Sequence, residues 1–169
     1  MAEIWDLVDE NRQPTNLTHK RGEPVPDGYF HIVIHCWIMN KQGKILLAQR
    51  QVGCTDQLLW ERTGGSLLTG ETSLQGAIRE VKEELGIDVS NCPNHFVKSQ
   101  MRPQYHDIFD SWLFVVDGEV QPILQEEEVR QTAWLTLEEV CQMDKNSQIV
   151  NSSRYYHEVY NLFQSIYKK

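Results

Sequence analysis

The sequence predicts one domain of mixed α and β structure, an α/β (α+β) fold. The chain has 169 residues, a length typical of a single domain. Several segments rich in β-branched and aromatic residues have the character of strands, and three others show helical spacing or helix-capping signals. Hydrophobic residues make up 40% of the chain and charged residues 24%, the composition of an ordinary globular domain.

Strand signals occupy both halves of the chain. Residues Ile4 to Val8 alternate apolar and polar side chains, which is a weak strand pattern. A hairpin is predicted further on, from a strand at Tyr29 to Met39, a turn at residues 40–43 and a second strand at Lys44 to Arg50. The remaining predicted strands are Asn94 to Met101, Ile108 to Asp117 and Gln131 to Leu135.

A loop rich in proline and glycine divides the chain near its beginning. Residues 21–28 contain two prolines and two glycines, which break regular structure. We therefore expect residues 1–28 to form an N-terminal extension that packs on a domain of residues 29–169.

Three helices are predicted. Thr72 and Gln75 form a capping-box pattern and Gly86 suits the end of a helix, so the first helix is expected at residues 73–85. A short helix opens at residues 136–139, and a longer one is expected from Ser153 to Tyr167. The longer helix carries an apolar stripe that we expect to pack in the core, made of Tyr156, Val159, Tyr160, Phe163 and Tyr167.

Composition and charge exclude several classes of protein. Sixteen Lys and Arg against 24 Asp and Glu give a net charge of −8, without a basic block of the kind that binds long nucleic acid. No segment approaches the ~18 consecutive apolar residues of a membrane span. The acidic N-terminus lacks the pattern of a signal peptide. We therefore expect a cytoplasmic protein.

The cysteines give no sign of disulfides or of a zinc site. They are widely separated and form no CxxC pair, which suits a reduced cytoplasmic protein. The sequence shows no Cys/His arrangement that suggests an activated thiol, so nucleophilic catalysis by cysteine is not expected. The four residues are Cys36, Cys54, Cys92 and Cys141.

The helix predicted at residues 73–85 carries the clearest chemical signal. At ~100° per residue, Glu80, Glu83 and Glu84 cluster about 140° from its apolar stripe. That stripe consists of Leu74, Ile78, Val81 and Leu85. Like charges three and four residues apart cost a helix roughly 0.2–0.5 kcal/mol per pair. The expected compensation is either Arg79 or a divalent cation such as Mg²⁺ or Mn²⁺, and the alternative is a charged helix face exposed to solvent.

The spacing around this helix resembles the motif of the Nudix hydrolases at every specified position. Gly65 is followed after five residues by Glu71, and after seven more by the run Arg79-Glu80-Val81-x-Glu83-Glu84-x-Gly86-Ile87. The resemblance implies an α/β/α sandwich with a mixed β-sheet between helices and a catalytic loop–helix–loop. It also implies Mg²⁺- or Mn²⁺-dependent hydrolysis of a pyrophosphate linkage in a nucleoside diphosphate derivative by a metal-activated water.

The resemblance also assigns roles to single residues. Glu83 and Glu84 take the positions of metal ligands. Glu80 also lies at the metal, either as a ligand or as the group that orients the attacking water. The carbonyl of Gly64 is the expected backbone ligand. Mg²⁺ is the expected cofactor, and Mn²⁺ is expected to substitute for it.

Two further catalytic roles follow from the same resemblance. Glu71 matches the glutamate that pairs with the motif arginine, here Arg79, and holds the catalytic helix in place. A glutamate from a later loop, ahead of a strand containing Trp, often acts as a base or as an extra metal ligand. Glu128 fits this position best, with Glu126 and Glu127 as alternatives, and a solvated acidic loop is the other interpretation.

The stretch ahead of the motif resembles a narrower branch, the type I isopentenyl-diphosphate isomerases. The pattern Glu3-x-x-Asp6-x-Val8-Asp9-Glu10 is typical of that branch, as is His31 at the start of a long strand. His19 matches a second isomerase metal ligand, although its spacing to His31 is longer. The catalytic cysteine of the isomerases is missing, since Gly64 occupies its position.

We therefore interpret the chain as an isomerase-like relative that hydrolyses. The alternatives are isopentenyl-diphosphate isomerase-like activity and a catalytically silent nucleotide-binding sensor.

The motif leaves the identity of the substrate open. It implies a small nucleoside diphosphate or other pyrophosphate as the partner, with candidate contacts in residues 51–59, in residues 101–110 and in the C-terminal helix. Side chains there and nearby that can stack on or clamp a base are Trp37, Trp60, Arg102, Tyr105 and Trp112. A homodimer is the default expectation for the assembly.

Overall fold

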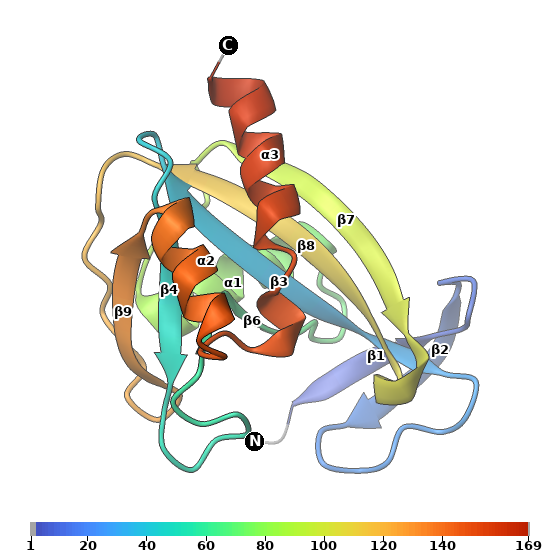
Figure 1. Ribbon diagram of the computed structural model, residues 1–169. Coiled ribbons are helices and arrows are strands. Elements are labelled where there is room, and N and C mark those ends of the chain that lie inside the picture. Colours follow the sequence, from blue (N-terminus) through green and yellow to red (C-terminus); the bar gives the residue numbers. More distant parts are fainter. Residues whose placement is uncertain (1–2, 169) are drawn as a thin grey trace.

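One long strand organises the sheet of the protein. The structure, a computed structural model, describes residues 3–168, and its strands form one nine-stranded sheet (Figure 1). Strand β3 (Phe30–Asn40) runs parallel to β8 (Asp107–Val116) along one edge. Along its other edge, β3 pairs antiparallel with β1 (Ile4–Val8), then β6 (Thr63–Ser66), then β4 (Ile45–Arg50).

The other strands extend the sheet outward from these. Strand β7 (Asn94–Arg102) pairs antiparallel with β8. Strands β5 (Trp60–Glu61) and β9 (Val129–Leu135) pair with the two edges of β4. Strand β2 (Pro14–Lys20) pairs with β1 as a hairpin. The sheet is therefore mixed, as predicted.

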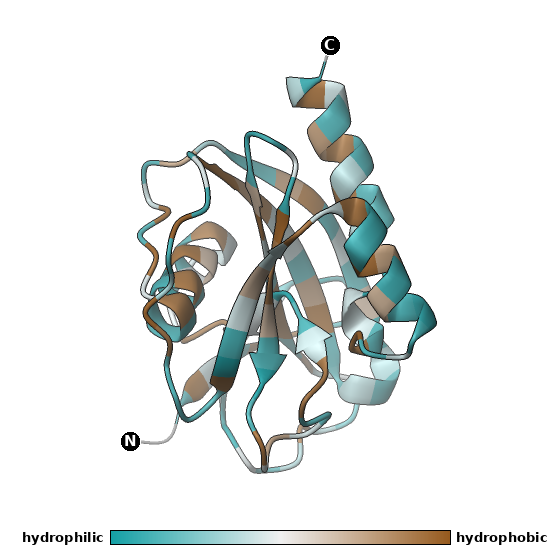
Figure 2. Ribbon diagram, turned by 60° about the vertical axis from the view of Figure 1, so that its left-hand side comes forward, coloured by the Kyte–Doolittle hydropathy of each residue, from teal (hydrophilic) through white to brown (hydrophobic). Residues whose placement is uncertain are grey.

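Helices cover both faces of the sheet. Helix α1 (Ser73–Leu85) lies on one side, and α2 (Leu137–Lys145) and α3 (Tyr156–Tyr167) lie on the other (Figure 2). Because successive residues of a strand point to opposite faces, β3 contributes to two separate cores. Ile34, Cys36 and Ile38 pack toward α1, and Trp37 and Met39 pack toward the C-terminal helices. This is the predicted α/β/α sandwich.

The long elements begin and end close to their predicted bounds. Helix α1 matches its prediction at both ends, where Thr72 Oγ1 accepts a hydrogen bond from the Gln75 N–H at 3.3 Å and Gly86 adopts a left-handed conformation with φ 65°. Helix α3 begins later than predicted because Asn151–Ser153 form a separate 3₁₀ turn. The apolar stripe of α3 packs in the core as expected.

Three short strands were not predicted from the sequence. Strand β2 is exposed along most of its length and therefore needs no apolar face. Its sequence accordingly lacks the alternation of apolar and polar residues on which strand prediction depends. Strand β6 reads Thr-Gly-Gly-Ser and contains few residues that favour strands. Strand β5 has only two residues. Pairing with β1, β3 and β4 defines all three.

The buried face of α1 differs from the predicted stripe. Leu74 and Ile78 are only half-buried, whereas Ala77 is fully buried and Glu80 is 9% exposed. A small residue facing the sheet lets the helix lie close to β3, and Gly76 continues that small surface. The alternative interpretation, a charged helix face exposed to solvent, therefore does not hold for Glu80.

Polar contacts hold the β1–β2 hairpin against the rest of the domain. The Thr69 N–H donates to the Ile4 carbonyl at 3.0 Å, and the Gly70 N–H donates to Asp6 Oδ2 at 2.8 Å. Arg12, between the two strands, donates two hydrogen bonds to the carboxylate of Asp110 at 2.6 and 2.5 Å. The hairpin thus contacts both β8 and the loop that precedes α1.

All four cysteines are free thiols. One cysteine has a histidine beside it that the sequence did not indicate, since Cys141 Sγ lies 3.6 Å from Nε2 of His157. Packing of α2 against α3 brings these two residues together although 16 positions separate them in sequence. Among residues 3–168, no helix is both long enough and apolar enough to cross a membrane.

Removing Arg12 should destabilise the domain in a pH-dependent manner. Asp110 is 1% exposed and Arg12 41%, so Arg12→Ala should lower the free energy of unfolding by about 2 kcal/mol, less than the ~3–5 kcal/mol of fully buried pairs. Burial alone would raise the pKa of Asp110, but the hydrogen bonds from Arg12, Ser73 and Ser99 together with the charge of Arg12 outweigh it and lower this pKa. The pair therefore contributes its full stabilisation above the unfolded pKa of about 3.9, and this contribution declines as the pH falls from there through the lower pKa of the folded state.

Urea unfolding between pH 7 and pH 3 measures this effect. The difference between wild type and Arg12→Ala should shrink at acid pH, and it should be smaller in an Asp110→Asn background. An Arg12→Ala loss that is unchanged by either condition would contradict the pairing.

Candidate active site

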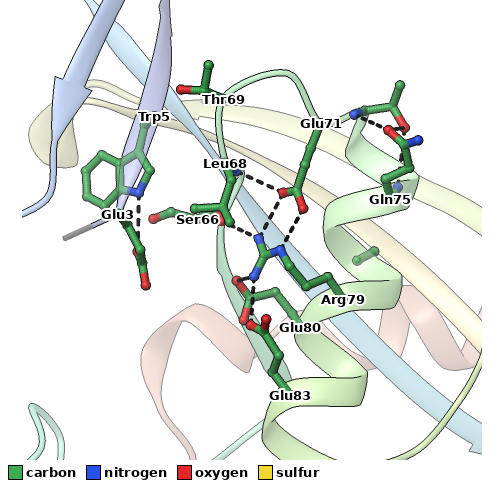
Figure 3. A network of polar contacts seen from close by, with 12 residues as sticks. Glu3, Trp5, Ser66, Leu68, Thr69, Glu71, Gln75, Arg79, Glu80 and Glu83 are labelled. Carbon is green, nitrogen blue, oxygen red and sulfur yellow. Dashed lines mark hydrogen bonds and ion pairs between the residues drawn. The ribbon is translucent and has the colours of Figure 1, made fainter. Parts of the chain in front are cut away.

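The guanidinium of Arg79 joins the loop before α1 to the helix itself (Figure 3). Its Nε donates to Glu71 Oε1 at 2.7 Å, and its Nη2 donates to Glu71 Oε2 at 3.0 Å. The same Nη2 also donates to the carbonyl of Ser66 at 3.0 Å. Such a two-point contact fixes both the distance and the orientation of the two groups. The expected contact between Glu71 and Arg79 is therefore present.

Glu71 is bound from two sides. Besides Arg79, its carboxylate accepts a hydrogen bond from the Leu68 N–H at 2.9 Å. Burial by itself would raise the pKa of Glu71, but the hydrogen bonds from Arg79 and Leu68 outweigh it and lower this pKa. Glu71 is therefore a charged anchor for the turn between β6 and α1.

The other edge of Arg79 binds two of the helix carboxylates. Its Nη1 donates to Glu80 Oε1 at 2.8 Å and to Glu83 Oε2 at 3.0 Å. Burial raises the pKa of Glu80 to about 7, although the nearby Arg79 charge opposes this shift. The side chain of Glu83 is 56% exposed, so its pair with Arg79 lies in contact with water. Two of the three clustered glutamates thus share one cation.

Glu84 points into a more acidic environment. It is half-buried, and burial, followed by the charges of Glu80, Glu61 and Glu128, raises its pKa well above the usual range. The backbone of Gly64 opposes that shift through a hydrogen bond. These carboxylates come from α1, β5 and the loop before β9, so three separate segments bring negative charge together.

Two glycines of β6 allow this close arrangement. A Cβ on Gly65 would lie 2.4 Å from Glu80 Oε1, so any side chain there would displace the Glu80 carboxylate. A Cβ on Gly64 would lie 2.0 Å from the carbonyl oxygen of Ile34 in β3. That neighbour is backbone in a paired strand and cannot turn aside. Glycine at position 64 is therefore required for β6 to lie this close to β3, and glycine at position 65 leaves the space that the Glu80 carboxylate occupies.

The carboxylates line a cavity of about 350 Å³. Its walls come from α1, from β6, from β4 with the loop after it, from β5, from the end of the loop before β9, and from the N-terminal hairpin. Of the residues with predicted metal or catalytic roles, the ones that line it are Gly64, Glu80, Glu83, Glu84 and Glu128. Arg79 and Glu71 do not line the cavity, but Arg79 contacts three residues that do, namely Ser66, Glu80 and Glu83. Glu126 and Glu127 do not line it either.

Several expected contacts lie elsewhere. Of residues 51–59 only Cys54 lines the cavity, and none of residues 101–110 does. His19 hydrogen-bonds through Nε2 with the Glu23 carbonyl at 2.9 Å. His31 stacks on Trp5 with ring centroids 4.3 Å apart. Neither histidine lines the cavity, so the resemblance of these two to isomerase metal ligands is not matched by their positions.

Five charged or aromatic lining residues were not singled out in the sequence as parts of the site. Arg50 is the last residue of a predicted strand, and a basic residue at the end of a strand was the one sequence signal that could have indicated a place in the site. For the others, only the tertiary pairing of distant segments reveals the location. The five residues are Glu3, Trp5, Arg21, Arg50 and Glu61.

The donor set suits a hard divalent cation. Carboxylate and carbonyl oxygens are the ligands that Mg²⁺ and Mn²⁺ prefer, and the cavity wall provides several carboxylates beside the Gly64 backbone. Within residues 3–168, however, no three acidic, His or Cys side chains are already arranged around one point. Glu80 and Glu83 point toward Arg79 instead. Binding of a cation by these residues therefore requires a rotation of at least one side chain.

The contacts of Arg79 predict unequal effects of two similar substitutions. With a chelator present to remove metal ions, Glu71→Gln should lower the free energy of unfolding by about 1.5 kcal/mol. The substitution weakens the half-buried two-point contact with the charged Arg79. Glu83→Gln removes an exposed pair at i, i+4 and should cost only about 0.3–0.5 kcal/mol.

Thermal and urea unfolding compare the two variants, and titration with Mn²⁺ follows. Glu71→Gln should reduce Mn²⁺ affinity less than Glu84→Gln does. Equal losses of stability in Glu71→Gln and Glu83→Gln would show that Glu71 is not the anchor.

Comparison with known proteins agrees with this architecture. The sequence matches the NUDIX domain over residues 29–156. It is 40% identical over 149 residues to an uncharacterised Nudix hydrolase of Listeria innocua, with 82% of each chain covered. It is 28% identical over 149 residues to an isopentenyl-diphosphate Delta-isomerase of Klebsiella pneumoniae, covering 78% of this chain and 74% of the isomerase.

Solved structures share the fold. A crystal structure from Deinococcus radiodurans superposes with a TM-score of 0.73 at 19% identity, covering 98% of this chain and 99% of that one. The NUDIX domain of Shewanella oneidensis NrtR, crystallised with ADP ribose, superposes with a TM-score of 0.55 at 16% identity over 67% and 77% of the two chains. Together with the match over residues 29–156, the loop and helix around Arg79 identify the chain as a member of the Nudix hydrolase family.

Proposed function

We propose that this protein hydrolyses a pyrophosphate linkage in a nucleoside diphosphate derivative, with Mg²⁺ as cofactor and Mn²⁺ as a substitute. The observation that carries the proposal is the convergence of Glu80, Glu83, Glu84 and Glu128 on one cavity beside the backbone of Gly64. The NrtR domain binds ADP ribose, which supports a nucleotide derivative as the substrate class.

Glu80, Glu83, Glu84 and the Gly64 carbonyl are the residues that would hold the cation. Burying several carboxylates together is unfavourable unless positive charge compensates them, and Arg79 compensates only Glu71, Glu80 and Glu83 by direct contact. When bound, Mg²⁺ lowers the pKa of a coordinated water and offsets the charge that develops on the phosphate oxygens.

The protein residues supply orientation and a proton acceptor. In the proposed reaction a water oxygen attacks phosphorus, its proton passes to a carboxylate, and the bond from phosphorus to the bridging oxygen breaks. Glu128 is the proposed base, because it lines the cavity from a segment other than α1 and is exposed enough to exchange protons with solvent. Arg79 and Glu71 act as positioning residues.

The isomerases among the relatives favour a second candidate, an isomerase-like reaction. Isomerisation of isopentenyl diphosphate needs an acid and a base on opposite sides of the carbon skeleton. Gly64 provides no side chain for such a role, and Cys54 is the one thiol among the described residues that line the cavity. A metal-dependent hydrolysis needs no thiol, so hydrolysis is the better supported reaction.

Metal binding should be measurable without a substrate. Mn²⁺ at millimolar concentration should raise the thermal midpoint, because a ligand that binds only the folded state stabilises it by mass action. Glu84→Gln should abolish most of this shift. The matched control is Glu138→Gln, which removes the same charge from an exposed position on α2 outside the cavity. No shift in the wild type, together with no Mn²⁺ density near Glu83 or Glu84 in a crystal, would refute the metal site.

Isotope incorporation distinguishes hydrolase from isomerase. With Mg²⁺, a panel of nucleoside diphosphate derivatives in H₂¹⁸O should yield one product with ¹⁸O in phosphate, and Glu84→Gln should slow this by at least ~10²-fold. Isopentenyl diphosphate in D₂O should give no deuterated dimethylallyl diphosphate. Cys54→Ser should leave hydrolysis intact. Deuterium incorporation that survives Glu84→Gln but is lost in Cys54→Ser would overturn the proposed function.

A further inference from the structure

The β1–β2 hairpin forms one wall of the cavity. Glu3 and Trp5 at the start of the chain and Arg21 directly after β2 line it, opposite the glutamates of α1. Figure 3 shows Glu3 and Trp5 beside Ser66 and the loop that leads to α1. The hairpin is therefore in a position to contact whatever the glutamates bind.

The end of the hairpin that reaches the cavity is held in place. The Arg21 N–H donates to the Glu3 carbonyl at 3.0 Å, which fixes the two backbones against each other. Trp5 is 9% exposed and stacks on His31. The Thr69 N–H and hydroxyl both donate to the Ile4 carbonyl. Backbone contacts on both sides thus set the position of Arg21 relative to the loop before α1.

Arg21 differs from the other cation that lines the cavity. Arg50 already donates to Glu61 and to the Thr55 carbonyl. Among the described residues, the Arg21 side chain donates one hydrogen bond, from Nη1 to Glu3 Oε1 at 2.8 Å, and it is 59% exposed. Its remaining N–H donors therefore have no protein acceptor within the described part of the chain.

We propose that Arg21 binds a phosphate group of the substrate from the cavity wall across from α1. The hairpin is therefore part of the substrate site. The inference rests on the proposed function, since it needs a diphosphate in the cavity. A guanidinium offers two parallel N–H donors to a phosphate. An exposed pair such as Arg21 and Glu3 is weak, so the phosphate can replace Glu3 at little cost.

Three single substitutions test the role of Arg21 by isothermal titration at fixed, saturating Mg²⁺. The probe is methylenediphosphonate, which mimics a diphosphate and cannot be hydrolysed at its bridge. Arg21→Gln should weaken binding about tenfold, the loss of one charge-assisted contact. Glu3→Gln should tighten binding, because it removes the competing carboxylate. Lys20→Gln is the matched control, since it removes the neighbouring positive charge from an exposed residue outside the cavity.

Readouts besides binding separate this role from a structural one. Arg21→Gln should keep the wild-type thermal midpoint and Mn²⁺ affinity, and Arg21→Lys should restore part of the diphosphonate binding.

Equal binding by wild type and Arg21→Gln, or equal losses in Arg21→Gln and Lys20→Gln, would overturn the role of Arg21 and leave the proposed hydrolysis standing. A lower midpoint in Arg21→Gln would assign it to the fold instead. If the wild type binds Mn²⁺ but no diphosphonate, the proposed function itself fails, and this inference fails with it.

Discussion

The arrangement of the site depends on one guanidinium. Arg79 binds Glu71 and the Ser66 carbonyl on one side and Glu80 and Glu83 on the other. Without a partner, each of these acceptors would cost stability. Glu71 and Glu80 are carboxylates at least partly removed from water, and the Ser66 carbonyl is a backbone acceptor. Glu83 is repelled by the other glutamates of the helix. A single planar cation with five donors satisfies all of them at once. Arg79 therefore joins the loop and the helix directly.

The loop and helix joined by Arg79 approach the sheet at two glycines of β6. Gly64 of β6 lies against the backbone of β3, and Gly65 lies against the carboxylate of Glu80. The absence of two Cβ atoms brings the acidic face of α1 to the edge of the central strand. Interior packing is dense enough that even a methyl group at either position must move a neighbour. The glycines of the motif thus determine how deep the acidic cluster lies.

Local patterns in the sequence predicted the long elements and the acidic helix, because caps, periodicity and motif spacing act within a few residues. They failed where a distant segment decides the outcome. Glu80 is buried because β6 covers it, although the helical period alone places it among exposed residues. Strand β2 and the position of Arg21 depend on the pairing of β1 with β2 on one edge and with β3 on the other. The contact of Glu71 with Arg79 was predictable only because the family motif encodes a tertiary contact in its spacing.

The same geometry bears on how hydrolase and isomerase relatives diverge. The resemblance aligns Gly64 with the isomerase cysteine, so one substitution would formally restore the thiol. A Cβ at this position, however, would lie 2.0 Å from the Ile34 carbonyl oxygen, a distance that no relaxation of a side chain can relieve. Strands β3 and β6 would have to separate, and Gly65, Glu80 and the Ser66 carbonyl bound by Arg79 would move with them. A thiol at position 64 is thus incompatible with the path that β6 takes in this chain, the path that also places Gly65 against the Glu80 carboxylate.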